Sequence, residues 1–204
     1  MAEVKLTKNE LRAQQARLSQ LEKYLPTLQL KKAMLQAEVS EARLEIVELE
    51  KQYEKEFARV EEVCSLLSAR INIDLEAVAK VEKVHKRYEN IAGVDVPYYE
   101  GVKFIDFTYN LFDTPPWIDA MILYLRELAE GRAKVGVARE KKAALEKELR
   151  EVSIRVNLFE KILIPRAERN IKKIKVFLGD QELAAVAQAK VAKSKIEAHK
   201  LIKR

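Results

Sequence analysis

A heptad pattern of apolar residues in the first third of the chain limits the folds it can adopt. With Leu18 at position a and Leu21 at position d, the series continues through Leu25, Leu28, Lys32, Leu35, Val39, Ala42, Ile46, Leu49, Tyr53, Glu56, Val60, Val63, Leu67 and Arg70. Only Lys32, Glu56 and Arg70 interrupt it. Sustained three-four spacing predicts a coiled-coil helix from about Leu6 to Ile71. Thr7 or Asn9 is suited to cap its start, and Pro26 predicts a kink or the point where the helix becomes regular.

A second seam follows in the last part of the chain. It runs through Leu145, Leu149, Val152, Val156, Phe159 and Leu163, and resumes as Ala167, Ile171, Ile174 and Leu178. Two successive steps of four between Leu163 and Ile171 shift its phase, which predicts local unwinding of the supercoil. Pro165, a helix breaker, lies within this shift. The start of the helix is predicted at Thr114 and Pro115, with Asp119 in the first turn.

The residues between the two seams have a different pattern. Residues 81–91 are compatible with a strand, residues 90–97 (NIAGVDVP) contain turn residues, and residues 102–110 are partly alternating and aromatic. These features predict a small β-hairpin or an irregular head. Residues 72–85 could instead continue a helix.

Neither seam can be buried by its own helix, so each is expected to cover the other. The intervening turns favour an antiparallel arrangement. We therefore predict an all-α fold: a long antiparallel two-helix coiled coil with a small β-hairpin or short-helix head between the helices. The expected parts are residues 1–71, 72–113 and 114–204. The second helix should extend about 20 residues past the first as a single helix, and its small residues there (Ala184, Ala185, Ala187, Ala189 and Ala192) suit a helix enclosed by something else.

Composition agrees with long helices, because 34% of the residues are charged while the chain has only five glycines and five prolines. A catalytic constellation is not visible, nor is a glycine-rich phosphate loop or zinc-ligand spacing. The single cysteine, Cys64, excludes an internal disulfide and is expected to pack beside the first seam. We expect no enzyme activity of the chain itself, no cofactor and no metal. Without a long apolar segment or signal peptide, we expect a cytoplasmic protein with no direct membrane insertion.

Positive charge is concentrated after Pro165. We call Arg166, Arg169, Lys172, Lys173 and Lys175 the basic belt; Glu168 is the only acid among them. Lys190 and Lys193 follow further along. Acidic residues are mixed freely with basic ones elsewhere, so their scarcity here indicates an acidic partner surface, although a solvated helix face would give the same pattern.

Several strings resemble the D subunit of the V-type and archaeal-type rotary ATPases over essentially the full length. They are LTKNEL (6–11), ENIAGVDVP (89–97), IPRAERNIKKIK (164–175), FLGDQE (177–182) and AKVAKSK (189–195). The resemblance implies the central shaft of a rotor, which couples ATP hydrolysis or synthesis on a catalytic hexamer to proton or sodium transport through a membrane ring. It places the protein peripheral to the membrane, as part of that complex.

The resemblance also implies partners. The terminal ends would enter a hexamer of A and B subunits, and the head would face the small F subunit and the funnel-shaped adaptor (C/d type) on the membrane ring. The residues expected to contact the hexamer are the basic belt with Gln181, Lys190 and Lys193. Those expected to contact the other stalk proteins are Ile91, Val94, Val96, Tyr98, Tyr99 and Phe104.

Two other functions share some of these features. A coiled-coil scaffold or tether would have the same seams, but it would not need the FLGDQE string or a basic, alanine-rich end. A nucleic-acid-binding coiled coil would place the same lysines on phosphates and show salt-dependent binding to DNA. We expect no nucleic-acid partner.

Overall fold

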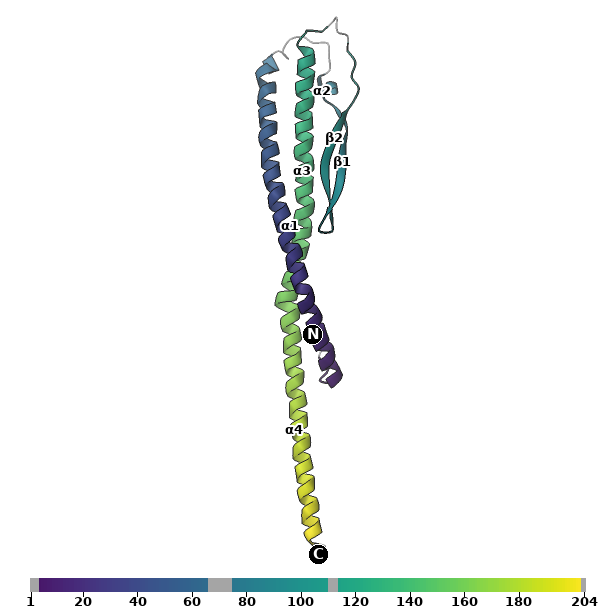
Figure 1. Cartoon of the computed structure of the whole chain (residues 1–204), viewed down its shortest axis with the longest axis vertical. Coiled ribbons are helices and arrows are strands. Elements are labelled where there is room, and N and C mark those ends of the chain that lie inside the picture. The colour runs from purple at the N-terminus through teal and green to yellow at the C-terminus, as the bar shows by residue number, and fades with distance from the viewer. Residues whose placement is uncertain (1–3, 66–74, 110–113, 203–204) are drawn as a thin grey trace. The chain divides into compact units, whose positions relative to one another are not determined.

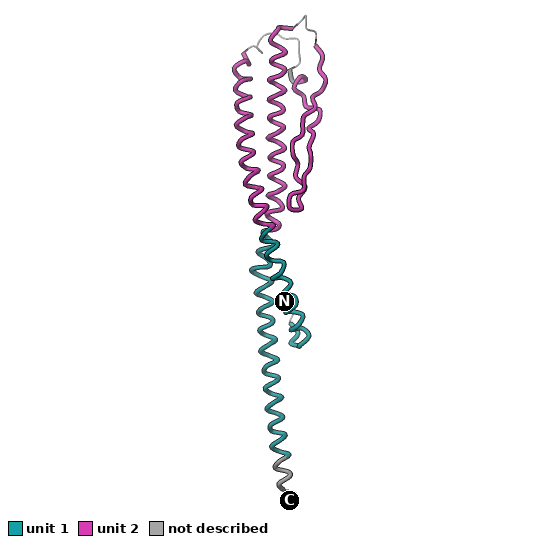
Figure 2. The backbone as a smooth tube through the Cα atoms, viewed as in Figure 1, with its two compact units in different colours: residues 1–30, 153–204 teal, residues 31–152 magenta. Residues whose placement is uncertain are grey.

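The computed structural model describes residues 4–65, 75–109 and 114–202 (Figure 1). Its elements are helices α1 (Lys8–Val63), α2 (Leu75–Val78), α3 (Ile118–Leu158) and α4 (Ile164–Ile202), the π-helix η2 (Phe159–Leu163), and strands β1 (Val81–Ile91) and β2 (Val94–Phe104). The chain forms two compact units: unit 1 contains residues 1–30 and 153–204, and unit 2 contains residues 31–152 (Figure 2). Long helices with a hairpin between them confirm the predicted fold class.

The first helix follows the predicted seam. Thr7 caps its start, because the backbone N–H of Glu10 donates to Thr7 Oγ1 at 3.3 Å, and the helix continues through Pro26. Every described a and d position from Leu18 to Val63 is buried or half-buried, including Lys32 and Glu56. The remaining two positions, Leu67 and Arg70, lie outside the described residues.

Within unit 2, α1 and α3 run antiparallel, and ion pairs between the two helices flank the apolar contact. As residue numbers rise along α1, those of the paired residues on α3 fall, and the N···O distances are 2.7–2.9 Å. The pairs are Lys31 with Glu148, Arg43 with Glu146, Glu45 with Lys141, and Glu50 with Arg139. Two of these pairs, Arg43–Glu146 and Glu50–Arg139, are exposed on both sides and add little stability. Their order defines the pairing register of the helices.

The two strands form an antiparallel hairpin with a tight turn at Ala92 and Gly93. Both turn residues have positive φ, 50° and 82°, which a two-residue hairpin of type I′ requires. Asn90 stabilises the turn, because its side chain donates to Asp95 Oδ1 at 2.8 Å and accepts from the N–H of Gly93 at 3.0 Å. The predicted hairpin is thereby confirmed.

A small apolar core lies at the open end of the hairpin. Val78 of α2 packs with Ile118 and Ile122 of α3, and Phe107, Tyr109 and Trp117 cover them. This packing places the start of α3 later than predicted. The α-helix begins at Ile118, and residues 115–118 form a preceding turn closed by a 3.1 Å bond from Ile118 N–H to the Pro115 carbonyl. Asp119 lies in the first turn, as expected.

In unit 1, the predicted phase shift takes the form of a π-helix. Each step of four residues along an α-helix overshoots a full turn by about 40°, so the steps from Phe159 to Ile171 would carry the seam out of contact. The π-helix η2 places an extra residue in one turn, with Ile164 N–H bonded to the Phe159 carbonyl. This widening occurs immediately before Pro165, which has no N–H to donate. Ala167 and Ile171 are consequently buried.

Candidate partner-binding surfaces

The described residues contain no metal centre and no membrane-crossing helix. No group of three or more His, Cys, Asp or Glu side chains could hold a metal ion in this part of the chain. Of the helices described, none has the length and apolar character to cross a bilayer. The expectation for Cys64 was wrong: it lies in a short turn after α1 and is exposed, because α1 ends at Val63.

All five residues of the basic belt are exposed on α4. Ala167, Ile171 and Ile174 between them are buried. By helical spacing, Arg169, Lys172 and Lys173 point away from these three residues, while Arg166 borders the cavity between α1 and α4. Within the described residues, none of the five forms an ion pair, and only Arg169 has an internal contact, a 3.2 Å hydrogen bond from its Nε to the carbonyl of Pro165. The structure therefore leaves five positive charges available to another molecule.

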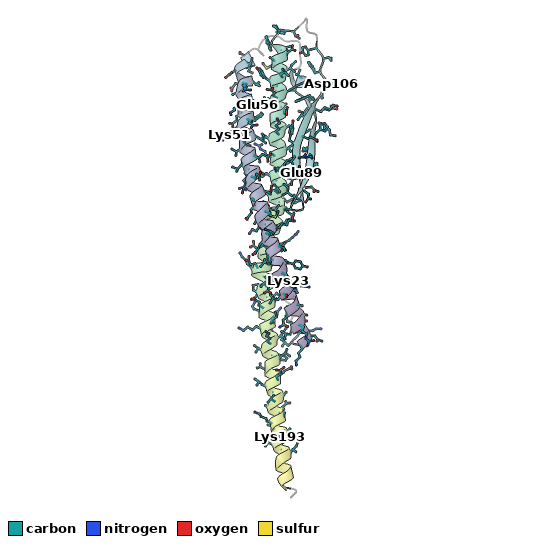
Figure 3. All side chains as sticks on the ribbon, in the orientation of Figure 1. Lys23, Lys51, Glu56, Glu89, Asp106 and Lys193 are labelled. Carbon is teal, nitrogen blue, oxygen red and sulfur yellow. The ribbon has the colours of Figure 1, made fainter. Side chains whose placement is uncertain are left out.

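Beyond the belt, α4 continues as a single helix. Among the residues that the structure describes, the ion pair with α1 that lies furthest along α4 joins Lys8 to Glu182 at 3.7 Å, while α4 extends to Ile202. Every side chain described from Asp180 to Ile196 is exposed, including Gln181, Lys190 and Lys193; Figure 3 labels Lys193 on this part of α4. This stretch also carries four apolar residues that are each more than half exposed: Leu183, Val186, Val191 and Ile196.

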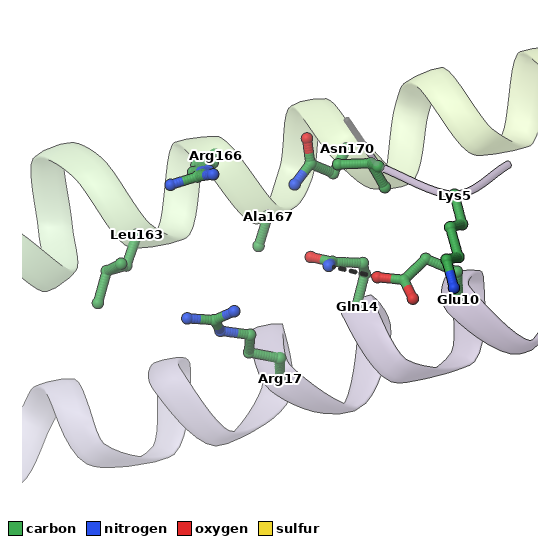
Figure 4. A pocket seen from close by; sticks show the side chains of 9 residues that line it. Lys5, Glu10, Gln14, Arg17, Leu163, Arg166, Ala167 and Asn170 are labelled. Atoms are coloured by element: carbon green, nitrogen blue, oxygen red, sulfur yellow. Dashed lines mark hydrogen bonds between the residues drawn. The ribbon is translucent and has the colours of Figure 1, made fainter. Parts of the chain in front are cut away.

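A cavity of about 380 Å³ lies between the start of α1 and the beginning of α4 (Figure 4). Its lining residues are Val4, Lys5, Glu10, Gln14, Arg17, Leu163, Arg166, Ala167 and Asn170. Arg166 is the one member of the basic belt among them. Gln14 is a d position of the first seam extended toward the N-terminus, and it meets Ala167 in place of a larger apolar side chain. The cavity thus has both polar and apolar walls and lies where the seam weakens.

The head residues predicted to contact partners mainly fasten the hairpin to α3. The aromatic rings of β2 lie under cations of α3, with Lys141 Nζ 4.2 Å from the Tyr98 ring, Lys134 Nζ 5.5 Å from the Tyr99 ring and Arg126 Cζ 5.2 Å from the Phe104 ring. Val96 is fully buried and offers no surface to a partner. Only Ile91 and Val94, half-buried beside the turn, lie at the tip of the hairpin.

Lys141 is the most deeply buried of these cations. Its Nζ lies 2.9 Å from Glu45 Oε2, and its side chain is 9% exposed. Burial by itself would lower the pKa of Lys141, but the hydrogen bond and charge of Glu45, together with the contact to Tyr98, raise it above the usual value. Lys141 therefore connects α1, α3 and the hairpin as a permanent cation.

Tyr99 has a similar connecting position. Burial, a hydrogen bond to Glu130 and the charge of Glu130 raise the pKa of Tyr99 to about 12. The hydrogen bond from Lys134 in turn holds the pKa of Glu130 below its usual value against the effect of burial. Tyr99 stays protonated at neutral pH and donates to this carboxylate.

Exposed apolar residues on α1 in unit 2 were not predicted from the sequence. Met34, Leu44 and Val47 are each about half exposed or more, and they occupy outer heptad positions. Exposed apolar side chains gathered on one surface are typical of protein-contact sites. Their occurrence at b, c and f positions, which a two-helix coiled coil leaves in solvent, was a signal available in the sequence.

Comparison with known proteins gives one consistent result. The family model described as the D subunit of ATP synthase matches residues 10–194. The V-type ATP synthase D subunit of Chlamydia caviae is 46% identical, over 98% of this chain and 96% of the relative. The proteins of the same name from Chlamydia pneumoniae and Chlamydia trachomatis serovar L2 are 43% and 42% identical; they align with 97% and 98% of this chain and with 95% and 98% of their own lengths.

Proposed function

Because the chain belongs to the D-subunit family of ATP synthases, we propose that it is a central stalk component of a V-type ATPase. In this role it couples ATP hydrolysis or synthesis on a catalytic hexamer to proton or sodium transport through a membrane ring. Residues 1–71 and 114–204 act as the shaft, and residues 72–113 act as the head.

The single-helix end of α4 carries this proposal. At 3.6 residues per turn, Leu183, Val186, Val191 and Ile196 point in directions of about 0°, 300°, 80° and 220° around the axis. A helix with apolar side chains on all sides is stable only when it is surrounded. Since the described part of this chain leaves all four exposed, other proteins of the complex must enclose the helix. A central cavity in a hexamer of A and B subunits provides that enclosure.

The basic belt adds asymmetry to the shaft. Three of its charges, Arg169, Lys172 and Lys173, lie on the face of α4 opposite the buried Ala167, Ile171 and Ile174. Each nucleotide state of the hexamer can then favour one orientation of the shaft through different contacts with this face, as any ligand-driven shift requires. Gln181, Lys190 and Lys193 extend the contact along the single helix.

The head is assigned to the membrane side of the complex. Ile91 and Val94 at the hairpin tip would contact the small F subunit or the ring adaptor, and Tyr98, Tyr99 and Phe104 would keep the hairpin rigid against α3. The chain itself is not catalytic, because ATP is bound and hydrolysed on the hexamer. It is cytoplasmic and attaches to the membrane through the ring.

A coiled-coil scaffold unconnected to rotation is not favoured. Such a protein has no need for a surrounded helix end, and the family match extends over residues 10–194. Purification from native membranes through a tag on this chain distinguishes the two functions. We expect the A, B and F subunits and the ring adaptor to be recovered together. Recovery of the chain without the A and B subunits would contradict the proposal.

The basic belt has its own test. Replacement of its five residues by glutamine should leave helix content and thermal unfolding of the isolated chain unchanged, because all five side chains are exposed. In the assembled complex we expect fewer ions transported per ATP hydrolysed. Normal coupling in this variant would remove the belt from the mechanism and leave the stalk assignment intact.

A further inference from the structure

The cavity in unit 1 has an excess of positive charge. Lys5, Arg17 and Arg166 line it, and Glu10 is the only acid in its lining. Glu10 is already engaged, because its Oε1 accepts a 2.8 Å hydrogen bond from Gln14 Nε2. In the described part of the chain, none of the three cations forms an ion pair. Three cations against one carboxylate leave a net charge of +2 in the cavity.

The arrangement of these groups suits a carboxylate. Figure 4 shows Arg17 on α1 and Arg166 on α4 on opposite sides of the same space, with the side-chain amide of Asn170 beside it. Guanidinium groups bind carboxylates through paired N–H donors. Because the cations come from two helices and from the segment before α1, the site forms only when α1 and α4 are paired.

We propose that this cavity receives one aspartate or glutamate side chain from the proteins that surround the shaft. This inference rests on the proposed function and identifies the chemistry of one contact within it. A side chain is favoured over a free anion by size: the cavity of about 380 Å³ has the volume of roughly a dozen waters at about 30 Å³ each. A carboxylate delivered on a chain segment fills such a space together with its neighbours, whereas a free oxyanion leaves most of it to water.

The proposed contact would also be sensitive to the pairing of the helices. Leu163, the last residue of η2, and Ala167, two residues after Pro165, form one wall of the cavity. The carboxylate therefore enters where the phase of the seam shifts.

The test compares Arg17→Gln/Arg166→Gln with the control Arg12→Gln/Lys23→Gln. The control removes the same charge from two exposed residues of α1 that do not line the cavity. We would measure the affinity of each full-length chain for the purified A–B hexamer at several salt concentrations. We expect the cavity variant to bind more weakly by about tenfold for each guanidinium removed, with a smaller effect in the control. Equal loss in both variants would overturn the inference.

A photocross-linking residue at Asn170 identifies the occupant. We expect cross-linked peptides from the hexamer that contain an aspartate or glutamate, and substitution of that acid should weaken binding of the wild-type chain but not of the cavity variant. If the complex retains the chain but gives no such cross-links, the inference about the cavity would be overturned, while the proposed function would stand. Failure of the wild-type chain to bind the hexamer would overturn the proposed function as well.

Thermal unfolding of the isolated chain tests whether the cavity binds a free anion instead of a carboxylate side chain of the hexamer. If millimolar phosphate or free glutamate stabilises the wild-type chain but not Arg17→Gln/Arg166→Gln, the cavity is a site for a free anion and the assignment to a side chain of the hexamer is wrong. We expect neither compound to shift the unfolding temperature of either chain.

Discussion

Oε2 of Glu56 on α1 occupies the space left by the missing side chain of Gly131 on α3: a Cβ at position 131 would lie 2.4 Å from it. This oxygen is buried and has no hydrogen-bond partner among the described residues. A charged residue at a d position of the seam is thus accommodated only because the facing helix has a glycine there. Burial raises the pKa of Glu56, with Glu127 and Glu130 adding to the effect and Lys134 and Arg59 opposing it.

The raised pKa makes stability depend on pH in a defined direction. The folded chain holds the proton of Glu56 more tightly than the unfolded chain, so this contribution is complete below the ordinary pKa of 4.5 and is lost as pH rises through the raised pKa. We expect Glu56→Gln to match the wild type at pH 4 and to be more stable at pH 8 by about 1 kcal/mol, or roughly 2–4 °C in unfolding temperature.

Thermal unfolding at the two pH values checks this prediction. Glu54→Gln, which neutralises an exposed carboxylate two residues away, is the control and should show no such difference. A gain at pH 8 that is equal in the two variants would show that surface charge, and not the buried carboxylate, is responsible.

Ala92 in the hairpin turn is strained. Its φ of 50° lies in the left-handed region, which costs a residue with a Cβ about 1–2 kcal/mol. Asparagine tolerates this conformation and is preferred before glycine in type I′ turns. We expect Ala92→Asn to stabilise the hairpin by about 0.5–1 kcal/mol, seen as slower amide hydrogen exchange in β1 and β2. Unchanged or faster exchange would mean that the turn is not strained.

Replacement of Glu45 should lower the free energy of unfolding, because the buried charge of Lys141 would lose its partner. In Glu45→Gln the ammonium loses the neighbouring negative charge, while its contact with Tyr98 remains. We expect a loss of about 1–2 kcal/mol in the free energy of unfolding. This is less than the 3–5 kcal/mol typical of a fully buried pair, since the Glu45 side chain is 41% exposed.

Denaturant unfolding measures that loss, and Arg43→Gln at the more exposed pair with Glu146 is the control, with an expected cost below about 0.5 kcal/mol. Lys141→Met should be neutral or stabilising, because an apolar chain of similar length removes the buried charge. A large loss in Lys141→Met together with no loss in Glu45→Gln would show that the cation binds its neighbours without needing Glu45.

The features predicted correctly from sequence depend on near neighbours in the chain. The seam from Leu18 to Val63 follows from heptad spacing, and the hairpin follows from turn residues between β-compatible segments. The phase shift at Leu163 to Ile171 was visible as two steps of four. In the structure this phase shift is accommodated by a π-helix. A coiled coil can also unwind in other ways, and residue spacing alone does not determine which one occurs.

The features that could not be predicted depend on contacts between distant segments. Arg17 and Arg166 line the same cavity only because α1 pairs with α4. Tyr98, Tyr99 and Phe104, whose predicted partner contacts stay predictions, lie beside cations of α3 in the same chain. No periodicity in either segment encodes that placement. The residues expected to contact the hexamer remain predictions.

Rotation of the head relative to the hexamer tests the central proposal most directly. The hexamer would be fixed to a surface, and a gold rod would be attached to a cysteine introduced by Lys83→Cys, an exposed position on β1, in a Cys64→Ser background. On addition of ATP, we predict that the rod turns in one direction while ATP is hydrolysed. Continued hydrolysis with only undirected fluctuation of the rod would contradict the assignment of this chain as the rotating shaft.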